Sequence, residues 1–373
     1  MPDRVQDVST AHIHATEIHN VVRRLISNLV DLKDPSGEFL LRLEDGRIID
    51  TKGWNDWEWT HGIGLYGIHQ YYALTGEKRC LQIIRDWFSD RFRAGTPTKN
   101  VNTMAPFLTL ANLYEEYRDS TYLPYLDTWA EWVMHDMPRT EEGGLQHIVF
   151  NSENPQQLWD DTLMMSVLPL ARIGQVLNRP QYLEEARRQF MLHVKYLQDS
   201  RTGLWFHGWT FDGRHNFAKA LWARGNSWVT IAIPEFIEML NLPPGDGLRE
   251  FLLGTLAAQV RTLAKHQDAS GLWHTLIDDP KSYLEASATA GFAYGILKSV
   301  RKRYLPASYA EVGLRAVQGV LNNIGEDGEL KNVSFGTAMG SDLDFYRRIP
   351  LTSMPYGQSM AMLALCELLR SRV

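Results

Sequence analysis

Apolar residues recur at helical spacing through most of this 373-residue chain. Recurrence at every third or fourth position is typical of helices with one buried face. Strict alternation of apolar and polar residues, which marks a half-buried strand, is rare. The pattern therefore predicts an all-α protein. The predicted helices cover residues 14–32, 59–76, 103–117, 122–137, 157–174, 182–197, 227–242, 248–267, 289–305, 309–324 and 356–371.

Short glycine-led segments between these helices resemble one another. They read GEFLLRLEDG from Gly37, GGLQHIVF from Gly143, TGLWFHGW from Thr202, SGLWHTLID from Ser270 and DGELKNVSFG from Asp327. The last three are separated by stretches long enough for two helices and their loops. This recurrence indicates a repeated helical hairpin.

Repeated hairpins can build an open solenoid or a closed ring. Residues 157–174 and 354–368 are apolar nearly all round, as expected of inner helices wrapped by amphipathic outer ones. We therefore predict a closed double ring of helices, an α/α toroid. No stretch rich in proline, serine or charge divides the chain, so residues 1–373 are predicted to form a single domain.

Composition narrows the class of ligand and the compartment. The formal net charge is −6 without runs of like charge, so we expect neither nucleic acid nor a membrane surface as a partner. Residues 1–20 contain no apolar core of signal-peptide length, and the only cysteines are Cys80 and Cys366, so we expect a cytoplasmic protein. The oligomeric state is left open.

Two adjacent aspartates interrupt the otherwise apolar residues 157–174. Asn154 as N-cap and Pro155 as first helical residue predict a helix whose early turns hold both acids. At 100° per residue, Asp160 and Asp161 point in different directions and should serve different places. A carboxyl in a pocket would have a raised pKa, which suits a general acid. Alternatively, both acids stabilise the positive end of the helix.

Tryptophan is abundant, with 12 residues, many of them on or beside the glycine-led loops. Trp59, Trp222 and Trp228 lie among polar residues, and such indole faces stack on sugar rings. Core packing is the alternative. Arg224, in WARGNSW, could hold a ligand carboxylate through two hydrogen bonds. Its alternative role is a structural ion pair.

Histidines give weaker signals. His147 and His207 lie on the repeated loops and are candidates for ligand contact or for local hydrogen bonding. No H-E-x-x-H pair is present, so we predict no metal site. Phosphate-binding loops, G-x-G-x-x-G after a strand and G-x-S-x-G are also missing, so we predict no cofactor and no serine hydrolase.

In their order along the chain, LWDDTLMM, GLWFHGW, WARGNSW and YGQSMAMLALCEL resemble the unsaturated rhamnogalacturonyl hydrolases of glycoside hydrolase family 105, relatives of the unsaturated glucuronyl hydrolases of family 88. The resemblance extends from about Trp54 to Leu368 and implies an (α/α)6 barrel, a six-hairpin toroid. Such enzymes act on oligosaccharides that a polysaccharide lyase has left with a 4,5-unsaturated uronic acid at the non-reducing end. An acid protonates C4 and water adds at C5, unlike the displacement used by ordinary glycosidases.

The resemblance also assigns roles. It matches Asp161 to the general acid of a W-x-D motif and leaves Asp160 as a structural neighbour. It places these residues at the substrate: His207, Trp222, Arg224, Trp228, Trp59 and His147. Asn102, in TKNVNTMAP, stands where some relatives carry a second acid, which implies a hydrogen bond to the water or the sugar in place of a charge.

Two other functions fit the same residues. An epimerase or isomerase on an α/α barrel would need His147, His207 and His274 to face one another across a pocket. A helical-repeat binding module would need no catalytic acid. For the hydrolase, a raised pKa at Asp161 predicts that activity falls as pH rises through that pKa. The sugar that follows the uronate is not specified by the sequence.

Overall fold

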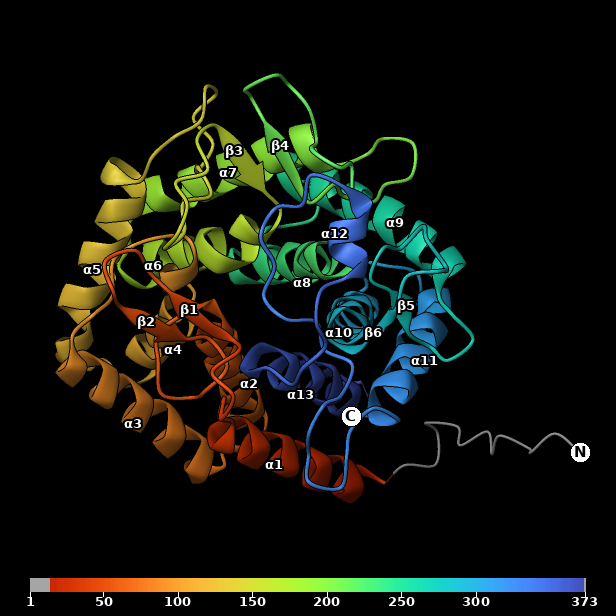
Figure 1. Cartoon of the computed structure of the whole chain (residues 1–373), viewed down its shortest axis with the longest axis horizontal. Coiled ribbons are helices and arrows are strands. Elements are labelled where there is room, and N and C mark those ends of the chain that lie inside the picture. Colours follow the sequence, from red (N-terminus) through yellow and green to blue (C-terminus); the bar gives the residue numbers. More distant parts are fainter. Residues whose placement is uncertain (1–13, 372–373) are drawn as a thin grey trace, which may run out of the picture.

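A computed structural model describes residues 14–371 of the chain. Its helices form two concentric rings (Figure 1). The inner ring consists of α2 (Trp59–Thr75), α4 (Phe107–Tyr117), α6 (Leu168–Val176), α8 (Ala223–Met239), α10 (Ala286–Arg301) and α13 (Pro355–Arg370). The outer ring consists of α1 (Ala15–Asp31), α3 (Lys78–Ala94), α5 (Leu123–Glu131), α7 (Pro180–Leu197), α9 (Gly247–His266) and α11 (Ala310–Leu321). Each inner helix packs on the next, and α13 packs on α2, which closes an (α/α)6 barrel.

Burial separates the two rings as the apolar pattern predicted. In α13 every residue from Pro355 to Leu369 is buried, because this helix is covered on all sides by its neighbours. In α1 only residues at helical spacing are buried, namely Ile18, Val22, Leu25, Ile26 and Leu29. A helix buried all round belongs inside, and a helix with one apolar stripe covers it. The predicted inner and outer layers are confirmed.

The glycine-led segments all carry a left-handed glycine. Gly203, Gly271 and Gly328 have φ values of 77°, 85° and 83°, a region that favours glycine. A β-carbon at any of these positions would overlap the backbone of an outer helix, at Ala258 of α9, Arg315 of α11 and Arg24 of α1, respectively. In these three segments the sequence repeat therefore corresponds to one kind of loop-to-helix contact.

Short strands lie in the connections between helices. The sheets are antiparallel pairs: β1 (Leu40–Arg42) with β2 (Ile48–Asp50), β3 (Gln157–Trp159) with β4 (Gly208–Thr210), and β5 (Trp273–His274) with β6 (Leu284–Glu285). The remaining short helices are η2 (Asn102–Met104), η3 (Ser120–Tyr122), η4 (Trp132–Asp136), η5 (Leu163–Val167), η6 (Ala307–Tyr309) and α12 (Leu343–Arg347). These connections carry most of the residues described below.

Two predictions about elements were wrong. Helix α3 was not predicted, because charged residues interrupt its apolar stripe and only Cys80, Ile84, Trp87 and Phe88 are buried. The helix predicted from Asn154 begins only at Asp161. Residues 157–159 instead pair with β4, and Asn154, with φ 45°, donates a hydrogen bond to the carbonyl of His147.

Among residues 14–371, none of the helices is both long enough and apolar enough to cross a bilayer. Residues 1–13, which contribute to the expectation that a signal peptide is missing, lie outside the described range.

Candidate active site

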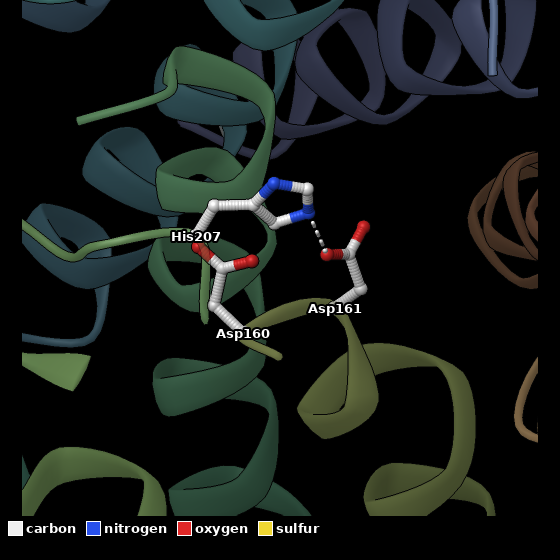
Figure 2. Close-up of side chains that lie close together, drawn as sticks. All are labelled: Asp160, Asp161 and His207. Carbon is white, nitrogen blue, oxygen red and sulfur yellow. Dashed lines mark ion pairs between the residues drawn. The ribbon is translucent and has the colours of Figure 1, made fainter. Parts of the chain in front are cut away.

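The pairing of β3 with β4 brings the two aspartates to His207. Trp159 stands opposite Gly208 in the ladder, and the backbone N–H of Asp160 donates to the carbonyl of His207 at 3.0 Å. The chain then turns into η5 and α6, so that both carboxyls lie beside the imidazole (Figure 2). The two acids therefore share one neighbourhood, although only Asp161 lines a cavity.

Asp161 faces a histidine that keeps it ionised. One of its carboxylate oxygens lies 3.2 Å from Nε2 of His207, as Figure 2 shows. The other ring nitrogen, Nδ1, lies 2.7 Å from the hydroxyl of Tyr346 on α12. Burial raises the pKa of Asp161, but the hydrogen-bonding and charge interactions with His207 outweigh it and hold that pKa below its ordinary value. The expectation of a raised pKa at Asp161 was wrong.

Asp160 is the carboxyl whose pKa is raised. It is fully buried, and neither of its oxygens has a hydrogen-bond partner among the described residues. Its carboxyl lies so close to Gly225 of α8 that no side chain would fit there. Burial, with the negative charge of Asp161, lifts the pKa of Asp160 well above its ordinary value. The two neighbouring carboxyls are therefore shifted in opposite directions, Asp160 toward its protonated form and Asp161 toward its ionised form.

A cavity of about 770 Å³ opens beside this pair. Its lining includes five of the residues predicted for the site: Trp59, Asn102, His147, Asp161 and Arg224. These residues come from α2, η2, the loop before β3, the helix start after β3, and α8. The wall of this cavity thus gathers residues that are far apart in the sequence.

Arg224 is a buried cation in that wall. Its side chain is 1% exposed. Nη1 donates to the Ser334 carbonyl at 2.9 Å and to the Tyr356 hydroxyl at 2.7 Å, and Nη2 donates to the Phe335 carbonyl at 3.0 Å. Within residues 14–371 it forms no ion pair, and its Nε has no partner. An unneutralised guanidinium beside a cavity favours an anionic ligand.

Trp222 and Trp228 were predicted to lie at the substrate, but neither of them lines the cavity. Both are buried, because they lie at the cap and first turns of an inner helix whose surroundings are filled by other side chains. The guanidinium of Arg224 lies 4.4 Å from the centre of the Trp222 ring. Trp228 packs edge-on against Trp59, with ring centres 5.9 Å apart. Trp222 and Trp228 therefore pack against Arg224 and Trp59, and it is Arg224 and Trp59 that line the cavity.

His207 and His274 also lie outside the lining. His274 is tied to the carbonyl of Ser282 through Nδ1. His147 does line the cavity, where it stacks on Trp159 with ring centres 4.0 Å apart. Burial lowers the pKa of His147 to about 3, so it is neutral at neutral pH. An epimerase would require the three histidines to face one another across the cavity. Only His147 lines it, so this requirement is not met.

Glu58 is a cavity residue that the sequence analysis missed. It is the N-cap of α2 and is 2% exposed. One carboxyl oxygen accepts from the Trp59 backbone N–H at 2.7 Å, and the other accepts from Nδ2 of Asn102 at 3.1 Å. Burial raises the pKa of Glu58 to about 8. The available signal was a single acid directly before an apolar helix, within GWNDWEW.

Asp160, Asp161 and His207 also bring potential metal-ligating atoms within 4.8 Å of one another. Nε2 of His207 already lies 3.2 Å from a carboxylate oxygen of Asp161. We assign no metal to this group of residues.

Comparison with known proteins identifies the class. The family model described as Glycosyl Hydrolase Family 88 matches residues 32–372. The chain is therefore a glycoside hydrolase, and it belongs to this family. The resemblance read from the sequence motifs is confirmed.

Individual relatives agree with this assignment. The unsaturated rhamnogalacturonyl hydrolase YesR of Bacillus subtilis is 33% identical over 319 residues, which cover 85% of this chain and 90% of YesR. A crystal structure from Salmonella enterica, described as a possible member of the GH105 family, has 61% identity, a TM-score of 0.97 and full coverage of both chains. A similarly described structure from Klebsiella pneumoniae has 62% identity and a TM-score of 0.95, with coverage of 100% of this chain and 96% of the other.

Proposed function

We propose that this glycoside hydrolase removes a 4,5-unsaturated uronic acid from the non-reducing end of lyase-generated oligosaccharides, with rhamnogalacturonan fragments as the first substrate class. The observation that carries the proposal is a cavity lined by both an unneutralised buried cation, Arg224, and an ionised carboxylate, Asp161. The name of YesR supports the choice of rhamnogalacturonan.

In this proposal Arg224 binds the carboxylate of the unsaturated sugar. Two N–H groups on one planar guanidinium match a carboxylate, and the half-buried Trp59 ring lies 5.8 Å from the guanidinium carbon. That ring offers a face on which the sugar can stack. His147 and Asn102, from other parts of the wall, supply polar contacts to the sugar hydroxyls.

Asp161 acts on the water. Because His207 keeps it ionised, it can accept the proton of a water molecule that attacks C5. Water addition converts C5 into a hemiketal, the ring opens, and the linkage at C1 breaks to release the remaining oligosaccharide. The proton for C4 must come from a group that still carries one.

The proposal also covers the domain that carries the activity, the compartment and the need for a cofactor. Residues 1–373 act as one catalytic domain, and the protein works in the cytoplasm on imported fragments. No cofactor takes part in the proposed steps.

The test is to incubate wild type and Asp161→Asn with unsaturated disaccharides that lyases release from pectin, ulvan and glycosaminoglycans. Hydration removes the conjugated double bond, so its ultraviolet absorbance should fall with wild type and stay constant with the variant. The fastest substrate identifies the parent polysaccharide. Absorbance that stays constant with wild type on every substrate would contradict the proposal. Equal rates for wild type and Asp161→Asn would remove Asp161 from the chemistry.

A further inference from the structure

The imidazole of His207 contacts an aspartate with one ring nitrogen and a tyrosine with the other. Nε2 lies 3.2 Å from Oδ2 of Asp161 (Figure 2), and Nδ1 lies 2.7 Å from the hydroxyl of Tyr346 on α12. His207 is buried, and within residues 14–371 its Nδ1 has no other hydrogen-bond partner. In a neutral imidazole, the hydrogen bond made by one nitrogen decides which nitrogen carries the proton. The Tyr346 hydroxyl is therefore placed to set the tautomer of His207.

The direction of the hydrogen bond follows from the other neighbours of this hydroxyl. The backbone N–H of Gly340 donates to it at 3.2 Å. Its own proton can go to Nδ1 of His207 at 2.7 Å or to Sδ of Met339 at 3.6 Å. A thioether is a weak acceptor and is also the more distant atom, so the O–H of Tyr346 donates to Nδ1. Burial raises the pKa of Tyr346, so the hydroxyl keeps this proton.

We propose that Tyr346 is a positioning residue of the active site, whose O–H donates to Nδ1 of His207 and so leaves the imidazole proton on Nε2, facing Asp161. The effect of this tautomer on catalysis rests on the function proposed above. An N–H at Nε2 is the partner that a carboxylate oxygen needs, whereas a bare nitrogen lone pair at that place would repel it. The contacts at the two ends of the ring thus favour the same tautomer.

The tautomer decides how Asp161 is presented to the substrate. Oδ2 of Asp161 is buried beside His207. The other carboxyl oxygen points away from the imidazole in Figure 2 and is left for the reaction. If the imidazole proton were on Nδ1, Oδ2 would lose its donor and the carboxyl could turn. A displacement of a reacting group by about 1 Å can lower a rate by about 10²-fold.

Packing holds the two rings independently of the hydroxyl. The His207 ring contacts Trp159 and Trp222, with ring centres 5.1 Å and 4.3 Å away, respectively. Tyr346 is fully buried, and its ring centre lies 5.9 Å from that of Trp222. Phenylalanine at position 346 can keep this packing. The variant Tyr346→Phe therefore removes the hydroxyl and leaves the ring in place.

The direct test observes the imidazole proton by NMR. In protein with isotopically labelled histidine nitrogens, the signals of His207 are assigned by their loss in His207→Gln. At neutral pH wild type should show a protonated Nε2 and a bare Nδ1. In Tyr346→Phe the Nδ1 signal should shift, because that nitrogen has lost its donor. Tyr309→Phe, on η6 before outer helix α11, removes a tyrosine hydroxyl elsewhere and should keep the wild-type signals.

Kinetics with an unsaturated disaccharide test the consequence for catalysis. Tyr346→Phe should lower kcat by about 2–10-fold, the factor that corresponds to one neutral hydrogen bond, and change KM by less than about twofold. KM should be kept because Tyr346 does not line the cavity. In a His207→Gln background, the same substitution should lower kcat no further, because the imidazole through which Tyr346 acts is missing. Tyr309→Phe should keep both kinetic constants.

The outcomes separate this proposal from the proposed function. If wild type consumes no unsaturated substrate, the proposed function fails, and the NMR signals still decide the tautomer. A protonated Nδ1 in wild type, or unchanged His207 signals in Tyr346→Phe, would overturn the assignment of Tyr346. A raised KM with an unchanged kcat would also overturn it, because Tyr346 would then act by holding Gly340, which lies between the cavity residues Met339 and Ser341. Additive losses of kcat in the double variant would show that Tyr346 does not act through His207.

Discussion

At the scale of single residues, Arg224 is the side chain that we propose selects an anionic ligand for the cavity. Its buried guanidinium forms no ion pair within residues 14–371. We predict that Arg224→Lys raises KM for an unsaturated disaccharide by about 10–100-fold, because one charged hydrogen bond is worth about 1.5–3 kcal/mol and lysine cannot form the bidentate contact. Steady-state kinetics from the loss of ultraviolet absorbance measure this change.

The control for Arg224 uses the substrate itself. The methyl ester of the uronate has no charge to bind, so wild type and Arg224→Lys should turn it over with similar KM. Circular dichroism checks that the variant keeps its helical fold, because Arg224 also donates hydrogen bonds to Ser334 and Tyr356 in wild type. An equal loss of affinity for acid and ester would show that Arg224 acts through the structure and not through the carboxylate.

The pKa of Asp161 is lowered mainly by one neighbour, His207. A carboxyl with a lowered pKa stays ionised until pH falls through that folded pKa, so the acidic limb of kcat/KM should lie below the ordinary aspartate range. His207→Gln removes the imidazole 3.2 Å away. We predict that its acidic limb moves to higher pH by about 1–3 units, the size of the effect of a nearby opposite charge. A limb that stays in place would show that His207 does not control the charge of Asp161.

At the scale of elements, the first turn of α8 packs closely against Asp160, which lies in the turn between β3 and the following helix. A β-carbon at Gly225 would overlap the Asp160 carboxyl, and Asp160 is linked to His207 by a backbone hydrogen bond. We predict that Gly225→Ala lowers the free energy of unfolding by about 1–3 kcal/mol, as overpacking does, and lowers kcat because it displaces Asp161. Chemical denaturation and kinetics measure the two effects.

Gly254, in the middle of α9, provides the matched control. A β-carbon there meets nothing within 4 Å, so alanine should raise stability by about 0.5–1 kcal/mol through its higher helix propensity. If Gly225→Ala behaved like Gly254→Ala, the contact with Asp160 would not constrain the turn.

The elements also show what can be predicted from the sequence. Long helices such as α13 were predicted because burial on all sides leaves a continuous apolar run. Strand β3 was not, since three residues are too few to display an alternation and their partner, β4, lies far along the chain. The pKa of Asp161 was wrongly predicted for the same reason: it depends on His207, which only the pairing of these strands brings into contact.

The site shows the same limit. Motifs and repeated loops predicted Asp161, Arg224 and His147 as site residues, and the structure places all three in the cavity lining. Glu58 has no motif of its own, and its surroundings are set by burial and by Asn102 from another loop. Trp222 and Trp228 were placed at the ligand because tryptophan near polar residues suggests sugar binding, yet the barrel uses them behind Arg224 and Trp59.

At the scale of the whole molecule, the outer ring closes where the loop after α11 meets α1. The backbone of Gly328, at φ 83°, lies against Arg24, and a β-carbon there would overlap the helix backbone. We predict that Gly328→Ala lowers the melting temperature and speeds hydrogen exchange in α1, because α1 must move away from the loop. The destabilisation should combine the strain of a left-handed alanine with overpacking of about 1–3 kcal/mol.

Gly46 separates these two contributions. It has the same left-handed backbone, with φ 86°, but a β-carbon there meets nothing within 4 Å. Gly46→Ala should therefore show only the backbone strain, and hydrogen exchange in α1 should stay as in wild type. Equal melting temperatures and equal exchange for the two variants would show that the Gly328 contact does not hold α1 in the ring. A larger loss at Gly328, with faster exchange confined to α1 and its neighbour α13, would show that this contact stabilises the closed barrel around the site.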